Sequence, residues 1–211
     1  MFRNIHNLVS INFTNFYSEN IEDMVRMFQG CNSLISFNFS GLNTQKLKYS
    51  YNMFHNCSSL KSVDISTISG ENLEDINSMF YNCFSLTSFD LSNFNFPSLK
   101  KMNIMFQGCI SLTSINLSNF QGEKVTTIDH MFYGCTSLTS LDFSTFLIPK
   151  IRNMDYLFYQ CYNLKFINIS SFNSASMIYD NPNNNTGQII INNKWEPHIK
   201  YFFPNMEITI I

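Results

Sequence analysis

The sequence has little charge and no clear excess of either sign. Charged residues make up 13% of the 211 residues, which is about half of the roughly 25% found in ordinary globular proteins. The 13 basic side chains are balanced by 15 acidic ones, so no positive field is available to hold a phosphate backbone, and nucleic-acid binding is not expected. Hydrophobic residues reach 45% and aromatic residues 16%, which excludes a disordered, charge-rich chain.

The chain also lacks long hydrophobic runs and the common catalytic motifs. No run of about 18 apolar residues is present, so no transmembrane segment is expected. No signal peptide is recognised in the first twenty residues. There is no G-x-S-x-G, no H-E-x-x-H and no glycine-rich phosphate loop among only 7 glycines. The 4 histidines share no pattern and are interpreted as solvated surface residues. We therefore expect no catalytic residues, no cofactor and no metal.

The cysteines define the organisation of the chain, because they recur every 26 residues without exception. Strict spacing of this kind is the signature of a repeat, not of a disulfide framework. Each cysteine lies in a block such as MFYNC (79–83), and an alternating segment such as SFDLSNF (88–94) follows. Thiols stacked in one column cannot converge tetrahedrally on zinc, so they are interpreted as a buried, reduced spine. The six are Cys31, Cys57, Cys83, Cys109, Cys135 and Cys161.

Two periodicities lie within each repeat. Apolar and polar residues alternate from Leu86 to Ser92, which predicts a short strand with one buried face. The apolar residues from Val125 to Cys135 fall at i, i+3, i+7 and i+10, which predicts about two to three turns of amphipathic helix. One such unit cannot bury a core alone, so the units are expected to stack as rungs of a solenoid. The expected strands lie near residues 10–14, 36–40, 62–66, 88–92, 114–118, 140–144 and 166–170.

The predicted fold is therefore an α/β repeat, with short parallel strands on one face of a solenoid and short helices on the other. Residues 1–172 are predicted to form about seven rungs of 26 residues, and residues 173–211 a C-terminal strand–helix–strand cap. The cap strands are expected over 188–192 and 206–211, and its helix over 194–203. Met1 and Phe2 align with the MF of the later blocks, so the first rung is expected to be uncapped, which leaves self-association through that rung open.

A column of charges supports the stacking. Glu22, Lys48, Glu74 and Lys100 occupy the same repeat position, so their signs alternate from rung to rung. We expect these residues to lie on successive helices and to favour the correct register, with little effect on stability because exposed ion pairs are weak.

The strand face is the best candidate for a functional site. Its central column carries only Asn and Asp, and Ser flanks it on both sides. Solenoids use extended faces of this kind for binding. The alternative interpretation is that a Ser/Asp/Asn face only keeps an exposed sheet soluble. The candidate partner-binding residues are Asn38, Ser62, Asp64, Ser88, Asp90, Ser114, Asn116, Ser140 and Asp142.

The pattern MF-x-x-C-x-S-L-x-x-h-D-h-S-x-F, in which h is apolar, resembles the BspA-type leucine-rich repeat proteins over roughly residues 1–172. The resemblance implies a leucine-rich repeat solenoid, a role in adhesion or protein recognition, and no enzymatic activity. The cysteine-containing repeats of ubiquitin-ligase substrate receptors share the 26-residue period. They carry a second cysteine column, however, where this chain has residues such as Phe94 and Phe120.

We predict a non-catalytic protein-interaction or adhesion module that binds a protein partner through the strand-lined face, and the resemblance points to a host extracellular protein. The alternative is an intracellular scaffold or substrate-recognition subunit. The resemblance implies a cell-surface location. A chain that really starts at Met1 would instead be cytoplasmic, because no signal peptide is recognised.

Overall fold

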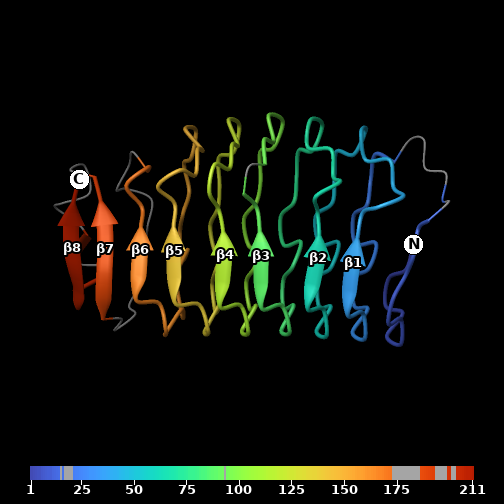
Figure 1. Cartoon of the computed structure of the whole chain (residues 1–211), viewed down its shortest axis with the longest axis horizontal. Coiled ribbons are helices and arrows are strands. Elements are labelled where there is room, and N and C mark those ends of the chain that lie inside the picture. Colours follow the sequence, from blue (N-terminus) through green and yellow to red (C-terminus); the bar gives the residue numbers. More distant parts are fainter. Residues whose placement is uncertain (15, 17–20, 93, 173–185, 193–198, 201–202) are drawn as a thin grey trace.

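The computed structural model describes the chain apart from residues 15, 17–20, 93, 173–185, 193–198 and 201–202. The described chain winds into a solenoid whose turns stack along one axis, with the strands side by side in chain order (Figure 1). The strands are β1 (Ser36–Asn38), β2 (Ser62–Asp64), β3 (Ser88–Asp90), β4 (Ser114–Asn116), β5 (Ser140–Asp142), β6 (Phe166–Asn168), β7 (Gly187–Ile191) and β8 (Met206–Ile210). The hydrogen-bonded groups are β1–β2, β3–β4 and β5–β6–β7–β8, and all pairing is parallel.

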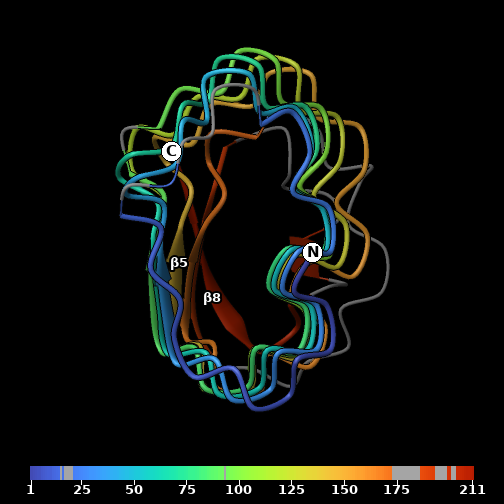
Figure 2. The same cartoon turned by 90° about the vertical axis from the view of Figure 1, so that its right-hand side faces the viewer.

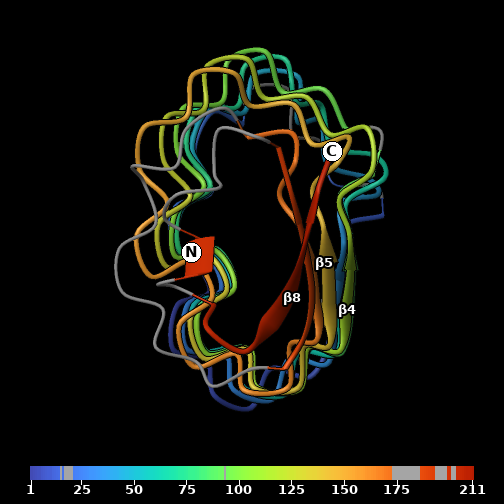
Figure 3. The same ribbon diagram turned by 90° about the vertical axis from the view of Figure 1, so that its left-hand side faces the viewer.

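The register of the strands follows the repeat. Phe37 pairs with Val63, and Phe89 pairs with Ile115, which are residues at the same place in neighbouring rungs. Views along the solenoid from its two ends show the rungs superposed, with the strands on one wall and the turns on the other (Figures 2 and 3). The solenoid prediction is therefore confirmed.

Strands β1 to β6 are shorter than the sequence predicted, because an Asn or Asp side chain ends each of them. In β3, Oδ1 of Asp90 accepts the N–H of Ser92 at 2.8 Å, which turns the chain after three residues. The strand expected near 10–14 is absent, and there Oδ1 of Asn12 accepts the N–H of Thr14 at 2.8 Å. This rung still follows the frame, since its Val9 carbonyl accepts the N–H of Ile35 at 3.1 Å.

The prediction of helices opposite the strands is wrong, because that wall consists of turns. The N–H of Phe132 donates to the carbonyl of Leu157 in the next rung at 3.2 Å, whereas an α-helix would direct it to Ile128. The neighbouring N–H of Met131 bonds within its own rung, to Ile128 at 3.1 Å. Alternate N–H groups thus link adjacent rungs, so the α-helical ladder cannot form. The apolar spacing marks the side chains that point inward from these turns.

In the turn wall, two positions of a rung adopt the left-handed backbone conformation, which also prevents a helix. In one rung they are His130, with φ of 55°, and Gly134, with φ of 72°. Gly and Asn tolerate this conformation better than other residues do. The second of the two positions directly precedes each cysteine, and Gly or Asn occupies it in five of six rungs. The residues at this position are Gly30, Asn56, Asn82, Gly108, Gly134 and Gln160.

The core is built from columns of identical residues. The rings of Phe28 and Phe54 stack with their centroids 5.7 Å apart and their planes 5° apart. Phe2 stacks on Phe28 at 5.3 Å, as expected from the alignment of the first residues with the later MF blocks. None of the six cysteines forms a disulfide, and all six are buried. Burial raises the pKa of the Cys57 thiol to about 12.

The charge column forms ion pairs on the turns and not on helices. Nζ of Lys48 lies 3.0 Å from a carboxylate oxygen of Glu22, and Nζ of Lys100 lies 2.5 Å from one of Glu74. The hydrogen bond from Lys100 lowers the pKa of the Glu74 carboxyl. The N–H of Glu74 donates to the carbonyl of Lys48 at 2.8 Å, so the middle rungs of the column are also adjacent.

Beyond the cysteine repeats, β7 and β8 extend the sheet in parallel. Both strands lie close to the ranges that the sequence predicted. The helix expected over 194–203 lies largely outside the described residues, of which Ile199 and Lys200 are helical. The assignment of residues 173–211 as a cap stays a prediction.

Candidate functional site: the strand face

Every candidate residue of the strand face occupies the first or third position of a three-residue strand and is exposed. In β3, Ser88 and Asp90 point to solvent while Phe89 is buried. Parallel register places Ser88 opposite Ser114 and Asp90 opposite Asn116. The same register places Asn38 opposite Asp64. The face therefore consists of one row of serines and one row of Asn and Asp side chains.

The Asn and Asp row has a structural role that sequence analysis missed. Oδ1 of Asn116 accepts the N–H of Ser118 at 3.2 Å and its hydroxyl at 2.7 Å. The N–H and the hydroxyl of Ser66 likewise lower the pKa of the Asp64 carboxyl. Such side chain–backbone bonds are the usual role of Asn and Asp at turns. The signal in the sequence was Asn or Asp followed two residues later by Ser or Thr.

Part of the face remains free to bond with another molecule. Within the described residues, the hydroxyls of Ser62, Ser88 and Ser114 have no protein partner. One carboxylate oxygen of Asp90 accepts the N–H of Ser92 in its own turn, and the second oxygen can accept from other donors. The row of serines thus offers donors and acceptors, and the neighbouring row offers carboxylates and amides.

A shallow depression of about 600 Å³ lies in the middle of this face. Five candidate residues line it together with Val63, Phe89 and Ile115: Ser62, Ser88, Asp90, Ser114 and Asn116. The remaining candidates flank the depression: Asn38, Asp64, Ser140 and Asp142. Within the described residues, no three His, Cys, Asp or Glu side chains gather into a metal-binding group.

The polar face ends at β6. There Phe166 takes the place of serine, and only 7% of Asn168 is exposed. The strands that follow, β7 and β8, carry mainly apolar residues. The candidate surface therefore extends over β1 to β5.

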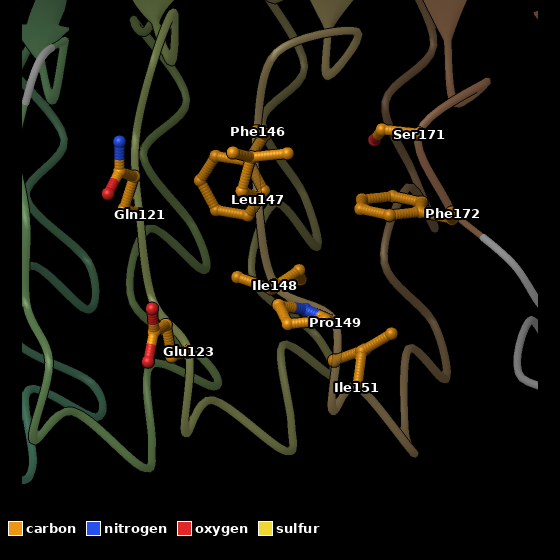
Figure 4. Close-up of a pocket in the computed structure, with 9 residues that line it drawn as sticks. All are labelled: Gln121, Glu123, Phe146, Leu147, Ile148, Pro149, Ile151, Ser171 and Phe172. Carbon is orange, nitrogen blue, oxygen red and sulfur yellow. The ribbon is translucent and has the colours of Figure 1, made fainter.

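A separate pocket of about 360 Å³ follows the ends of β4, β5 and β6, and sequence analysis did not predict it. Figure 4 shows Glu123 on one side of the lining, Phe172 on the other and Phe146 between them. Its lining is mostly apolar: Gln121, Glu123, Phe146, Leu147, Ile148, Pro149, Ile151, Ser171 and Phe172. Residues 173–185, which follow Phe172, lie outside the described residues, and we assign no ligand to this pocket.

No helix among the described residues has the length and apolar character needed to cross a membrane.

Two of the histidines differ from the solvated surface residues that the sequence suggested. The rings of His55 and Tyr81 stack at 4.5 Å, and those of His130 and Tyr156 lie 4.7 Å apart. Burial lowers the pKa of His55.

The leucine-rich repeat protein of T. pallidum resembles this chain in structure. Its TM-score is 0.51 at 19% identity, covering 86% of this chain and 76% of that protein. Two further structures are a leucine-rich cell surface protein from Faecalibacterium prausnitzii A2-165, with TM-score 0.48, 22% identity and coverage of 66% and 34%, and a leucine-rich repeat protein from Bacteroides ovatus, with TM-score 0.44, 21% identity and coverage of 88% and 56%. The chain thus spans about a third of the length of the Faecalibacterium protein.

Among proteins with curated descriptions, none matches the chain by sequence. A family described as "Mycoplasma protein of unknown function, DUF285" matches residues 1–115 and 82–188. The resemblance to BspA-type leucine-rich repeats is thereby confirmed. The chain is a leucine-rich repeat solenoid, and it belongs to the Mycoplasma protein family of unknown function DUF285.

Proposed function

We propose that the protein is a non-catalytic interaction module that binds a protein partner through the strand face. The observation that carries this proposal is the depression at β2 to β4, which is lined by residues predicted from the sequence as partner-binding. Extended faces of solenoids are suited to binding because they offer a long, regular surface on a rigid frame.

The chemistry of the face favours a polar partner with basic groups. The exposed carboxylates of Asp64, Asp90 and Asp142 lie on one row with no exposed basic side chain between them in the strands. The serine hydroxyls beside them can donate to and accept from a partner backbone. Such a face gives orientation and specificity through complementary charge and hydrogen bonds more than through apolar burial.

Within this function, we favour adhesion at a cell surface, which the resemblance to BspA-type proteins implies. An intracellular scaffold would use the same face and differs in location. Treating intact source cells with a membrane-impermeant amine reagent separates the two. We expect labelling of the protein, whereas labelling only after lysis would contradict adhesion and favour the scaffold.

The binding face is tested by site-specific photo-crosslinking. A photoreactive amino acid at Ser88 reports on the depression, and the same amino acid at the exposed Asn56 reports on the turn wall. We expect one partner to be trapped from Ser88, and this product to be lost when Asp90→Lys is added. Equal trapping from Asn56, or trapping that survives Asp90→Lys, would contradict a partner seated on the strand face.

A further inference from the structure

The turn wall lies across the solenoid from the strand face (Figure 2). In its last rungs this wall carries a cluster of aromatic side chains whose rings contact one another. We define the tyrosine cluster as His130, Tyr133, Tyr156, Tyr159 and Tyr162. The rings of Tyr133 and Tyr159 lie 5.0 Å apart, and those of Tyr156 and Tyr159 meet edge to face at 5.9 Å. Tyr162 is 61% exposed, and the other members are half-buried. The cluster is therefore a packed surface with its outer parts open to solvent.

The fold does not require tyrosine at these places. Tyr133 and Tyr159 share one repeat position, and the same position carries Gln29, His55 and Gln107 in other rungs. The glutamine rungs keep the same backbone hydrogen bond, since the N–H of Asn82 donates to the carbonyl of Gln107 at 2.8 Å just as that of Gly134 donates to the carbonyl of Tyr159 at 2.8 Å. Because the backbone of the repeat also forms with glutamine at this position, the aromatic rings of the last rungs are available for another role.

The ring stacking decides which parts of the cluster meet solvent. Tyr133 and Tyr159 stack on each other along the solenoid, with 29° between their planes, so each covers part of the face of the other. Within the described residues, the hydroxyls of Tyr133, Tyr156 and Tyr159 have no protein partner. Burial, and then the neighbouring tyrosines, raise the pKa of Tyr133, so its hydroxyl stays protonated near neutral pH. The cluster thus offers rigid apolar edges that end in hydrogen-bonding hydroxyls.

Two carboxylates accompany the rings at one repeat position. Asp129 is occupied, because it accepts from the Thr127 hydroxyl and its carboxylate lies 3.1 Å from Nδ1 of His130. The half-buried carboxylate of Asp155, one rung further on, has no protein partner in the described chain. Asp155 directly precedes Tyr156 in the chain, so this part of the turn wall carries an unpaired carboxylate as well as unpaired phenols, and such acceptors suit a positively charged donor.

We propose that the tyrosine cluster, together with Asp155, is a second binding surface and that it receives an arginine-containing segment of a partner protein. A guanidinium carries five N–H donors in one plane and has no acceptor, so an arginine side chain suits a surface whose unpaired groups are a carboxylate and phenol oxygens. Tyrosine gives large rigid contacts at low entropic cost and is enriched at the energetic centres of interfaces. This surface is independent of the strand face.

The test uses a fluorescein-labelled hexaarginine peptide at physiological ionic strength and measures its anisotropy with the full chain. The variants carry residues that other rungs use at the same positions: Tyr159→Gln, as Gln107, and Asp155→Asn, as Asn103. Each is expected to weaken peptide binding about tenfold or more, as loss of a central interface contact does. Arg152→Gln, which removes an exposed cation three residues before Asp155, is expected to strengthen binding.

Two controls keep the test specific. Tyr81→Gln changes the same repeat position outside the cluster, and Asp90→Asn removes a charge from the strand face. Both are expected to leave the affinity for hexaarginine unchanged. Equal affinity of Tyr159→Gln and the natural chain would overturn the proposal, as would absence of peptide binding. A loss confined to Asp90→Asn would also overturn it, while leaving the proposed role of the strand face intact.

Discussion

The thiol of Cys83 lies 3.2 Å from the carbonyl oxygen of Phe54, which also accepts the N–H of Cys57 at 3.0 Å. One carbonyl thus closes a turn in its own rung and bonds the cysteine of the next. The same relationship recurs along the spine, as between Cys109 and Phe80 at 3.1 Å. It explains why a cysteine, a small apolar residue with a weak donor, recurs in every block.

Removing one of these thiols is expected to destabilise the solenoid. Cys83→Ala leaves a small cavity and one carbonyl with a bond fewer, and we expect the free energy of unfolding to fall by about 1–2 kcal/mol. Urea unfolding measures the change. Ser114→Ala, at an exposed position of β4, is the matched control and is expected to stay within about 0.5 kcal/mol of the natural chain. Equal effects of the two substitutions would contradict a structural role of the spine.

The thiols are also expected to make stability fall at alkaline pH. Burial raises the pKa of Cys57 and of Cys161 from 9.0 to about 12. Above pH 9 the unfolded chain loses these protons while the folded chain keeps them, so the unfolded state binds fewer protons and stability decreases as pH rises from about 9 to 12. Melting temperatures across this range measure the fall. A thiol reagent at pH 8 should label no cysteine of the folded chain, and rapid labelling of all of them would contradict the burial.

The left-handed positions of the turn wall allow a clean test of backbone strain. At Gly134, φ is 72°, and an added Cβ would meet no atom closer than 3.8 Å. Gly134→Ala therefore changes backbone preference without a clash, and we expect a loss of about 1–2 kcal/mol in the free energy of unfolding. Gly134→Asn, which copies Asn82 of another rung, should cost less. Equal stability of the alanine variant and the natural chain in urea would show that the turn relaxes.

The contribution of the strand face to stability can be tested separately from binding. Asp90→Ala removes the acceptor for the N–H of Ser92, and we expect a loss of about 0.5–1.5 kcal/mol in the free energy of unfolding. Asp90→Asn keeps an oxygen in that place and should be nearly neutral. Thermal unfolding of both variants decides the matter. Equal loss in both would mean that the charge, and not the turn, supports the fold.

The stacking of 26-residue rungs in register could be predicted from the sequence, because the register depends on side chains that repeat. Phe28 and Phe54 stack, as the 26-residue spacing requires. The helices were wrong because the apolar spacing from Val125 to Cys135 suits any backbone that turns its side chains inward at intervals. Sequence periodicity does not report that Phe132 donates to the next rung. The Gly or Asn before five of the six cysteines was the overlooked signal, since neither belongs inside an apolar helix.

The candidate site was predictable only in part, for a physical reason. Alternation identified the exposed residues of the strand face, because a strand sends successive side chains to opposite sides. It could not show that Asn116 bonds to Ser118, since that contact is local and needs backbone geometry. The tyrosine cluster was not predicted, because its members, such as Tyr133 and Tyr156, occupy different positions in the repeat. Only the conformation of the turns brings them together.

The strand face is the proposed binding surface, and it is tested by the affinity of the partner trapped from Ser88. Purified partner is titrated against the natural chain, Ser88→Arg and Asn56→Arg, in each case after melting temperatures confirm the fold. Ser88→Arg places a bulky side chain in the depression, and we expect the affinity to fall about a hundredfold, as for a central interface residue. Asn56→Arg should leave the affinity unchanged. Unaltered affinity of Ser88→Arg would show that the partner does not bind at the depression of the strand face.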